Sequence, residues 1–376
     1  MSKTCLLVMA STSVVIVSNS FAQYATLVGA VVSPAYTNPL TALGEPSRTG
    51  DSFGAPLTPV SPAVQTNQII CVDFSSDPLF NGWRAVGNTN LFRWNPGSQH
   101  LDVTWDSAQT NSYFQYPLGT IVNRWDDFSV AFDLVLKDVA AGFDPNKPST
   151  FPLAIGLQNK ASATATNFLR STGHNSPNLV EFDFFPDTGF GPTVWPAVWS
   201  TNSSLTYNGP SDYTLVDLPV GVAIHIAMTY TASNSTLITT IKTNGAPIAV
   251  VNPVTLSSKF TDFWVDTFAV ESYAETRPAG PGAGSLLAHG IVDNVRIIVP
   301  PPPVQLLVGS FASGQWQTTF LSRTNWAYVL EGTRDFQSWS EVSPHANGTG
   351  GALSFRDTNA APWNGRFYRI KSQRFN

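Results

Sequence analysis

The sequence predicts an all-β protein, an antiparallel sandwich followed by a second, smaller β-sandwich domain. Short runs rich in Val, Ile, Thr and Phe alternate with turn clusters, and several runs show the two-residue alternation of a strand. No stretch has the periodicity of an amphipathic helix. Only 12% of the residues are charged, whereas roughly a quarter are charged in an ordinary soluble domain. This composition favours β-structure over a helical fold.

Residues 1–22 are interpreted as a signal peptide. Lys3 precedes an apolar run from Cys5 to Val17, and small residues lead up to Ala22, which is the pattern that a signal peptidase recognises. The run is too short to cross a bilayer, and no later run reaches about twenty apolar residues, so no transmembrane segment is predicted. We therefore expect a secreted or cell-surface protein.

Residues 23–66 contain six prolines and three charged residues and show no strand or helix period. Such a segment is interpreted as a linker or as extended chain lying on a domain. Its stretch TALGEPSRTGDSFGAPLTPVSPA resembles an N-terminal segment of exported bacterial proteins, and this resemblance indicates no function.

Residues 67–300 are expected to form the first domain. Asn244-Gly245 separates two strand-like runs and is a tight-turn signal. Many strands without intervening helices indicate an antiparallel sandwich. The nine clearest runs are QIICVDF, HLDVTWD, FSVAFDLVLKD, FPLAIGLQN, NLVEFDFF, VAIHIAMTYTA, STLITTIKTNG, DFWVDTFAVES and HGIVDNVRIIV.

Residues 301–376 are expected to form the second domain, because the prolines at 300–303 make a stiff break and four further strand-like runs follow it. Seven basic and four acidic residues follow the break, although the whole chain has a net charge of −5. No basic stripe occurs anywhere, so nucleic acid is excluded as a partner.

Three carboxylates stand in one of the most apolar runs of the chain. Side chains alternate along a strand, so Glu181 and Asp183 share one face, and Asp187 shares it too if the strand stays regular. Carboxylates on one face repel each other unless a cation, a substrate or water separates them. The pattern leaves open a metal site, a glycosidase carboxylate pair and a solvated polar face.

From 67 to 300 the chain resembles the concanavalin A-like lectin and glucanase superfamily, a jelly-roll sandwich that also includes laminin G-like modules. The match is VEFDFFPD, residues 180–187, which is similar to the metal-binding strand of legume-type lectins. The resemblance implies that Glu181, Asp183 and Asp187 are metal ligands. Pro192 and Ala197 stand where that family has a second Asp and a His. Without the imidazole, the remaining oxygen ligands suit calcium.

The spacing of the catalytic carboxylates in the glucanase branch of the same superfamily can be compared with this sequence to ask whether the chain is an enzyme. Its retaining members place the nucleophile and the acid/base on one strand face as Glu-x-Asp-x-Glu or Glu-x-Asp-x-x-Glu. Counted from Glu181, the acid/base positions are Phe185 and Pro186, which cannot protonate a leaving group. A non-catalytic protein is therefore favoured, and a divergent glycoside hydrolase or polysaccharide lyase stays open as the alternative.

Aromatic residues in turn-rich segments indicate a glycan ligand, because sugars stack their C–H faces on indole rings. The candidate ligand-binding residues are Trp195 and Trp199, followed by Trp94 and Trp105. Each single tryptophan could also fill the core. The sequence thus predicts a lectin-like protein that binds a polysaccharide or glycan, with a purely structural surface protein as a further alternative.

The second domain resembles a fibronectin type III-like module appended to exported bacterial proteins. The resemblance rests on the runs WAYVLEGTRDFQSWSEV, LSFRDT and RFYRI. It implies a small β-sandwich and specifies no ligand.

Overall fold

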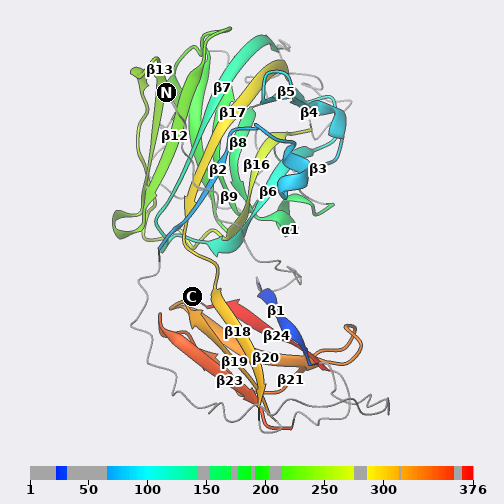
Figure 1. The fold of residues 1–376 in the computed structure, drawn as a ribbon. Coiled ribbons are helices and arrows are strands. Elements are labelled where there is room, and N and C mark those ends of the chain that lie inside the picture. The colour runs from blue at the N-terminus through cyan, green and yellow to red at the C-terminus, as the bar shows by residue number, and fades with distance from the viewer. Residues whose placement is uncertain are drawn as a thin grey trace, which may run out of the picture. The chain divides into compact units, whose positions relative to one another are not determined.

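The computed structural model divides the chain into two compact units, both built almost entirely of strands (Figure 1). The larger unit is Asn67–Pro301, and the smaller unit combines an N-terminal strand with Pro302–Asn376. The predicted fold class, an all-β sandwich followed by a smaller β-sandwich, is confirmed. The structure describes residues 23–31, 66–141, 152–166, 168, 170, 177–187, 191–202, 213–274, 286–312, 315–359 and 366–375.

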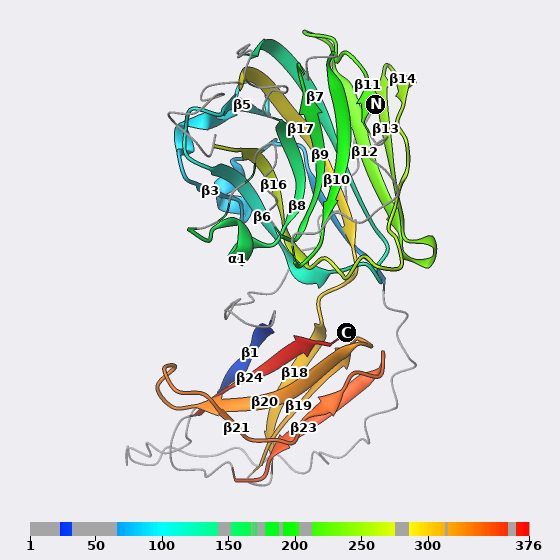
Figure 2. The same ribbon diagram turned by 180° about the vertical axis from the view of Figure 1, so that it is seen from behind.

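One face of the larger unit is a seven-stranded antiparallel sheet, which Figure 2 shows. The strands β6, β8, β9, β10 and β16 form its centre, and β3 and β11 are its edges. In spatial order they are β11 (Thr214–Leu215), β10 (Thr193–Trp199), β9 (Leu179–Phe185), β8 (Leu153–Gln158), β16 (Val265–Ser272), β6 (Ser112–Val122) and β3 (Arg84–Val86).

A nine-stranded antiparallel sheet forms the opposite face, visible in Figure 1. Its long strands β7 and β17 pair side by side along most of their lengths. In spatial order the strands are β14 (Ala246–Val250), β13 (Thr236–Thr243), β12 (Ile224–Thr231), β7 (Phe128–Ala141), β17 (Leu286–Val299), β5 (His100–Asp106) and β4 (Phe92–Asn95), with β15 (Val254–Thr255) on β13 and β2 (Gln68–Val72) on β17.

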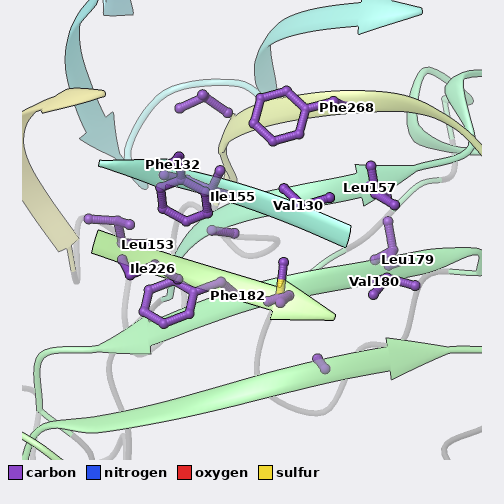
Figure 3. Close-up of a cluster of buried hydrophobic side chains, with 14 of the residues drawn as sticks. Val130, Phe132, Leu153, Ile155, Leu157, Leu179, Val180, Phe182, Ile226 and Phe268 are labelled. Atoms are coloured by element: carbon purple, nitrogen blue, oxygen red, sulfur yellow. The ribbon is translucent and has the colours of Figure 1, made fainter. Parts of the chain in front are cut away.

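The hydrophobic core lies between these two sheets (Figure 3). Ile155 and Phe182 of the seven-stranded sheet are completely buried, as are Val130, Phe132 and Ile226 of the nine-stranded sheet. The rings of Phe132 and Phe182 meet with their centroids 6.0 Å apart. Burying a side chain of this size stabilises the fold by roughly 1.5–3 kcal/mol. The core uses every second residue of β9, so the acidic residues of β9 point to the other side of its sheet.

The smaller unit contains two sheets. Their strands are β1 (Gln23–Val31), β24 (Arg366–Arg374), β20 (Trp326–Thr333), β21 (Ser340–Glu341) and β22 (Ala346–Asn347) in one sheet, and β18 (Val304–Ala312), β19 (Gln315–Ser322) and β23 (Ala352–Asp357) in the other. Trp326, Tyr328 and Tyr368 are buried between them, and Trp316 stacks on Tyr368 with ring centroids 5.0 Å apart. The fibronectin type III-like identity of this unit stays a prediction.

Helices are few and short. The described ones are η1 (Pro78–Asn81), η2 (Thr89–Leu91), α1 (Lys160–Ala163) and η4 (Ala232–Asn234). In the described part of the chain, none has the length and apolar character needed to cross a membrane.

The N-terminal segments are only partly described. The predicted signal peptide, residues 1–22, lies outside the described residues. Of the proline-rich segment 23–66, residues Gln23–Val31 form β1, an extended strand that pairs with β24. Extended chain lying on a domain therefore describes this part of the segment.

Candidate functional site

Polar side chains gather on the side of the seven-stranded sheet that faces away from the core. Cross-strand pairs put Trp195 beside Asp183 and Gly156 beside Glu181, and directly paired residues of an antiparallel sheet point to the same side. We call this side the polar face. Its members include Tyr113, Gln115, Gln158, Glu181, Asp183, Thr193, Trp195, Trp199, Thr267 and Glu271.

Arg170 lies over the polar face and binds both acids of β9. Its Nε and Nη2 atoms are 3.2 and 3.1 Å from Oε2 of Glu181, and Nη2 is 2.5 Å from Oδ2 of Asp183. All three side chains are almost completely buried. The guanidinium also lies 5.6 Å from the Trp199 ring and 5.9 Å from the Tyr273 ring. One buried cation therefore neutralises part of the charge of the acidic strand.

The Tyr273 hydroxyl completes the coordination of Glu181 by donating a hydrogen bond to its Oε1. Both oxygens of Glu181 thus accept hydrogen bonds inside the protein. Burial raises the pKa of Tyr273 well above its usual range, and the charges of Glu181 and Glu271 raise it further. Tyr273 consequently stays a donor at neutral pH.

A third carboxylate, Glu271 of β16, is completely buried on the same face. Its carboxyl group lies close to Glu181 and to the Tyr273 hydroxyl, and both affect its pKa. Burial raises the pKa of Glu271 well above its usual range, and the neighbouring charge of Glu181 raises it further. Glu271 therefore keeps its proton to a higher pH than an exposed glutamate does. We call Arg170, Glu181, Asp183, Glu271 and Tyr273 the carboxylate cluster.

Gly156 makes room for this cluster on β8. A Cβ atom at Gly156 would lie 2.2 Å from the carbonyl oxygen of Val180 and 2.7 Å from Cα of Glu181. Real Cβ atoms do not approach backbone so closely, so any other residue here would push β9 away. The close approach of β8 to β9 fixes the backbone from which Glu181 projects.

The carboxylate cluster does not fit the calcium site that the resemblance implies. Calcium takes six to eight oxygen ligands, whereas Glu181 and Asp183 already share the Arg170 guanidinium. Asp187 follows β9 and is half-buried. No group of three or more Asp, Glu, His or Cys suited to a metal occurs among the described residues. Calcium binding at β9 is still an untested prediction. The guanidinium of Arg170, which pairs with both Glu181 and Asp183, argues against it.

Calcium should accordingly leave the melting temperature of the larger unit unchanged, because Arg170 occupies the place between the acids. Thermal melts with calcium and with a chelator test this directly. A site with a Kd one hundredth of the free calcium concentration would add about 2.7 kcal/mol to the free energy of unfolding. A rise of that size, lost in Asp183→Asn, would show that calcium does bind here.

The structure separates the four tryptophans proposed for ligand binding. Trp105 is completely buried in the core between the sheets, and Trp199 is 4% exposed beneath Arg170. Trp94 lies on β4 in the other sheet and donates from its Nε1 to the carbonyl of Phe74 at 3.0 Å. These positions correct the prediction that Trp105 and Trp199 offer open stacking surfaces. Trp195 remains, half-buried on the polar face.

Trp195 belongs to a group of aromatic side chains that lie apart in the sequence. Its ring centroid is 4.8 Å from that of Tyr213 and 6.4 Å from that of Phe185. Tyr213 is 37% exposed and directly precedes the edge strand β11. We call Phe185, Trp195 and Tyr213 the aromatic platform. It adjoins the carboxylate cluster, because Trp195 and Asp183 are direct cross-strand neighbours.

Four residues of the site were missed from the sequence: Arg170, Tyr213, Glu271, and Tyr273, which directly follows the run DFWVDTFAVES. Arg170 and Tyr213 stand outside every strand-like run, so no periodicity marks them. Glu271 did carry a signal, since it directly follows the apolar residues Phe268, Ala269 and Val270 in the run DFWVDTFAVES. A charged residue within a buried strand is a reason to look for a partner.

No family model matches the sequence, and no curated protein is similar to it in sequence. Solved structures similar to the chain include lectin UEA-II complexed with galactose, at 17% identity, a TM-score of 0.41 and coverage of 63% of this chain and 100% of that one. Others are winged bean acidic lectin complexed with methyl-alpha-D-galactose (12%, TM-score 0.39, 62% and 98%) and arcelin-5, a lectin-like defense protein from Phaseolus vulgaris (13%, TM-score 0.38, 62% and 98%). Such distant likeness leaves the activity to be argued from this chain's own residues.

Proposed function

We propose that the larger unit binds carbohydrate without cleaving it, at the aromatic platform beside the carboxylate cluster. The observation that carries the proposal is the pairing of a half-buried indole, Trp195, with the carboxylate of Asp183 on the neighbouring strand. Stacking surface next to a hydrogen-bond acceptor matches the two kinds of surface that a sugar presents.

The geometry of the platform supports stacking from outside. Tyr213 covers part of Trp195 and is itself exposed, so a ligand can reach the two rings together. Oδ1 of Asp183 accepts no hydrogen bond from the described residues, which leaves one acceptor beside the rings. A buried acceptor without a partner costs about 1–3 kcal/mol. Because Asp183 is completely buried, a sugar hydroxyl would reach this oxygen and remove that cost only if the neighbouring side chains moved aside.

Two features of β9 argue against cleavage: the buried state of Glu181 and the types of residue that follow it. Arg170 and Tyr273 hold both oxygens of Glu181, and the side chain is completely buried. A nucleophile in that state is screened from substrate. Phe185 is part of the aromatic platform and has no proton to give, as the spacing of the strand predicts.

Trp195→Ala should weaken glycan binding by about 1–3 kcal/mol, by analogy with base–aromatic stacking. A glycan array finds the ligand, and isothermal titration calorimetry of a hit with the wild-type chain and the variant measures the loss. Tyr213→Ala should weaken binding in the same direction.

Trp125→Ala is the matched control. Trp125 is 62% exposed in the turn between β6 and β7 and is not part of the polar face, so its loss should leave affinity unchanged. Trp105→Ala should instead cost roughly 3–5 kcal/mol of stability as a core truncation. A folded Trp195→Ala variant with wild-type affinity would contradict the proposed site.

A glycoside hydrolase is the second candidate, and Glu271 is the observation that favours it. Its raised pKa suits a general acid, and Glu181 is close enough to raise that pKa through its charge. Release of reducing ends from a bound polysaccharide, lost in both Glu271→Gln and Glu181→Gln, would establish cleavage and overturn the non-catalytic proposal.

We place this function outside the cell, secreted or at a bacterial surface, on the strength of the signal-like N-terminus alone. Mass spectrometry of the protein from culture medium or the cell envelope should find a chain that starts at Gln23. A chain that keeps Met1 and stays in the cytosol would contradict export.

A further inference from the structure

The smaller unit is closed by the two ends of the described chain. β1 pairs with β24 in antiparallel register, from Gln23 opposite Gln373 to Val31 opposite Arg366 (Figures 1 and 2). The entire larger unit lies between β1 and the rest of the smaller unit in sequence. β1 is therefore a strand that reaches its sheet from a distant part of the chain.

β1 is the end strand of its sheet, whose order is β1-β24-β20-β21. β20 pairs with the other side of β24, from Trp326 opposite Arg374 to Thr333 opposite Phe367. Without β1, one whole side of the nine-residue strand β24 would present unpaired backbone N–H and C=O groups. Such an edge pairs readily with any extended segment that fits it.

The sequence of β1 suits an exchanged strand. Its nine residues, QYATLVGAV, include no charge and no proline, which are two of the features that keep an edge strand from pairing with other chains. Only one irregularity interrupts the pairing, between Leu27 and Gly29. The same backbone hydrogen bonds would form whichever copy of the chain supplied the strand.

The connection between β1 and the larger unit is long enough for exchange. Residues 32–66 can span up to about 120 Å when fully extended, at roughly 3.3–3.6 Å per residue. That reach exceeds the size of a domain, so it allows β1 to pair within its own chain or with a neighbour.

We propose that β24 accepts β1 from a second copy of this chain, and that two copies exchange their first strands to form a closed dimer. Reciprocal exchange satisfies both β24 edges and leaves no strand free, which is the condition for a closed assembly. Local concentration favours the intramolecular pair when protein is dilute, and exchange grows as the protein concentration rises.

The test mixes two preparations of the full chain that carry different mass tags and follows them by native mass spectrometry. Dimers that contain both tags should appear on incubation, faster on warming. A synthetic peptide of the β1 sequence should compete with this exchange and bind to the chain. A peptide with both Thr26→Pro and Leu27→Pro should not, because one of two neighbouring N–H groups of an end strand points to its partner and proline removes that hydrogen bond.

A rearranged chain provides the control. Gln23 lies opposite Gln373 near the end of β24, so the β1 sequence can be removed from the N-terminus and attached after Asn376 through a short Gly-Ser turn, which makes a hairpin with β24. This variant should fold, stay monomeric and not bind the β1 peptide. Wild-type chains that remain monomeric at every concentration and never mix, or a rearranged chain that dimerises as the wild type does, would overturn the proposal.

Discussion

Replacing Arg170 with methionine should lower the free energy of unfolding of the larger unit by about 3–5 kcal/mol, the cost of removing one partner from a buried ion pair. The variant leaves the carboxylates of Glu181 and Asp183 buried without the guanidinium that contacts both of them at 2.5–3.2 Å. Calorimetric melts of the full chain, in which the two units are followed separately, measure the loss.

The loss of stability should come from the unpaired buried charges of Glu181 and Asp183, and not from the packing that the Arg170 side chain provided. A triple variant, Arg170→Met with Glu181→Gln and Asp183→Asn, removes the buried charges as well and should regain most of the stability. Arg296→Met, at an exposed position of the same unit, should have little effect. A single Arg170→Met variant as stable as the wild type would show that the guanidinium does not neutralise the cluster.

Glu271→Gln should stabilise the larger unit increasingly as the pH rises above about 4.3, the usual pKa of an exposed glutamate. Burial and the charge of Glu181 raise the pKa of Glu271 in the folded state. Between the unfolded and the folded pKa the folded chain holds a proton that the unfolded chain has released. The wild-type free energy of unfolding therefore falls as the pH rises, by at most about 1.4 kcal/mol per unit. Glutamine keeps the shape and removes this dependence.

Melting temperatures of the wild type and Glu271→Gln from pH 4 to pH 9 give the measurement. The difference between them should be small at the acidic end and should widen until the folded pKa is passed. Asp217→Asn changes an exposed carboxylate of the same unit and should give a constant difference. A gap between wild type and Glu271→Gln that does not change with pH would show that Glu271 ionises normally.

The strands of the larger unit were predictable where alternation was clean. HLDVTWD became β5 without a shift of either end, and the other eight strand-like runs all contain a strand. The prediction succeeded because one face of each sheet is buried in a common core, which imposes the alternation that the sequence displays.

Four strands of the seven-stranded sheet were missed. The edge strands β3 and β11 are only two or three residues long, and proline interrupts β6 and β10. β6 contains Pro117 and Gly119, and its pairing with β16 shifts register between Val265 and Thr267. β10 contains Pro196, but β11 pairs only with Thr193 and Val194. Among the residues that the structure describes, no strand pairs with that side of β10 at Pro196, where a missing N–H is tolerated.

Only those features of the site that lie within the single strand β9 could be predicted from the sequence. Alternation along β9 gives the shared face of Glu181 and Asp183 correctly. It does not reveal that both faces of β9 are buried, or that Arg170, which stands outside every strand-like run, supplies the opposing charge. Trp195 is half-buried and Trp105 is completely buried. This difference comes from the packing of the folded chain, and the local sequence around each tryptophan does not show it.

The pairing of β1 with β24 also sets the order in which the chain can fold during synthesis. The larger unit is complete once Pro301 has been made, and it contains both of its sheets by then. β1 is made before the larger unit, and its partner β24 is made after it. At roughly 5–20 residues per second, tens of seconds pass between them. The smaller unit is therefore finished only after the larger one, and a nascent chain carries β1 through that interval before its own β24 exists.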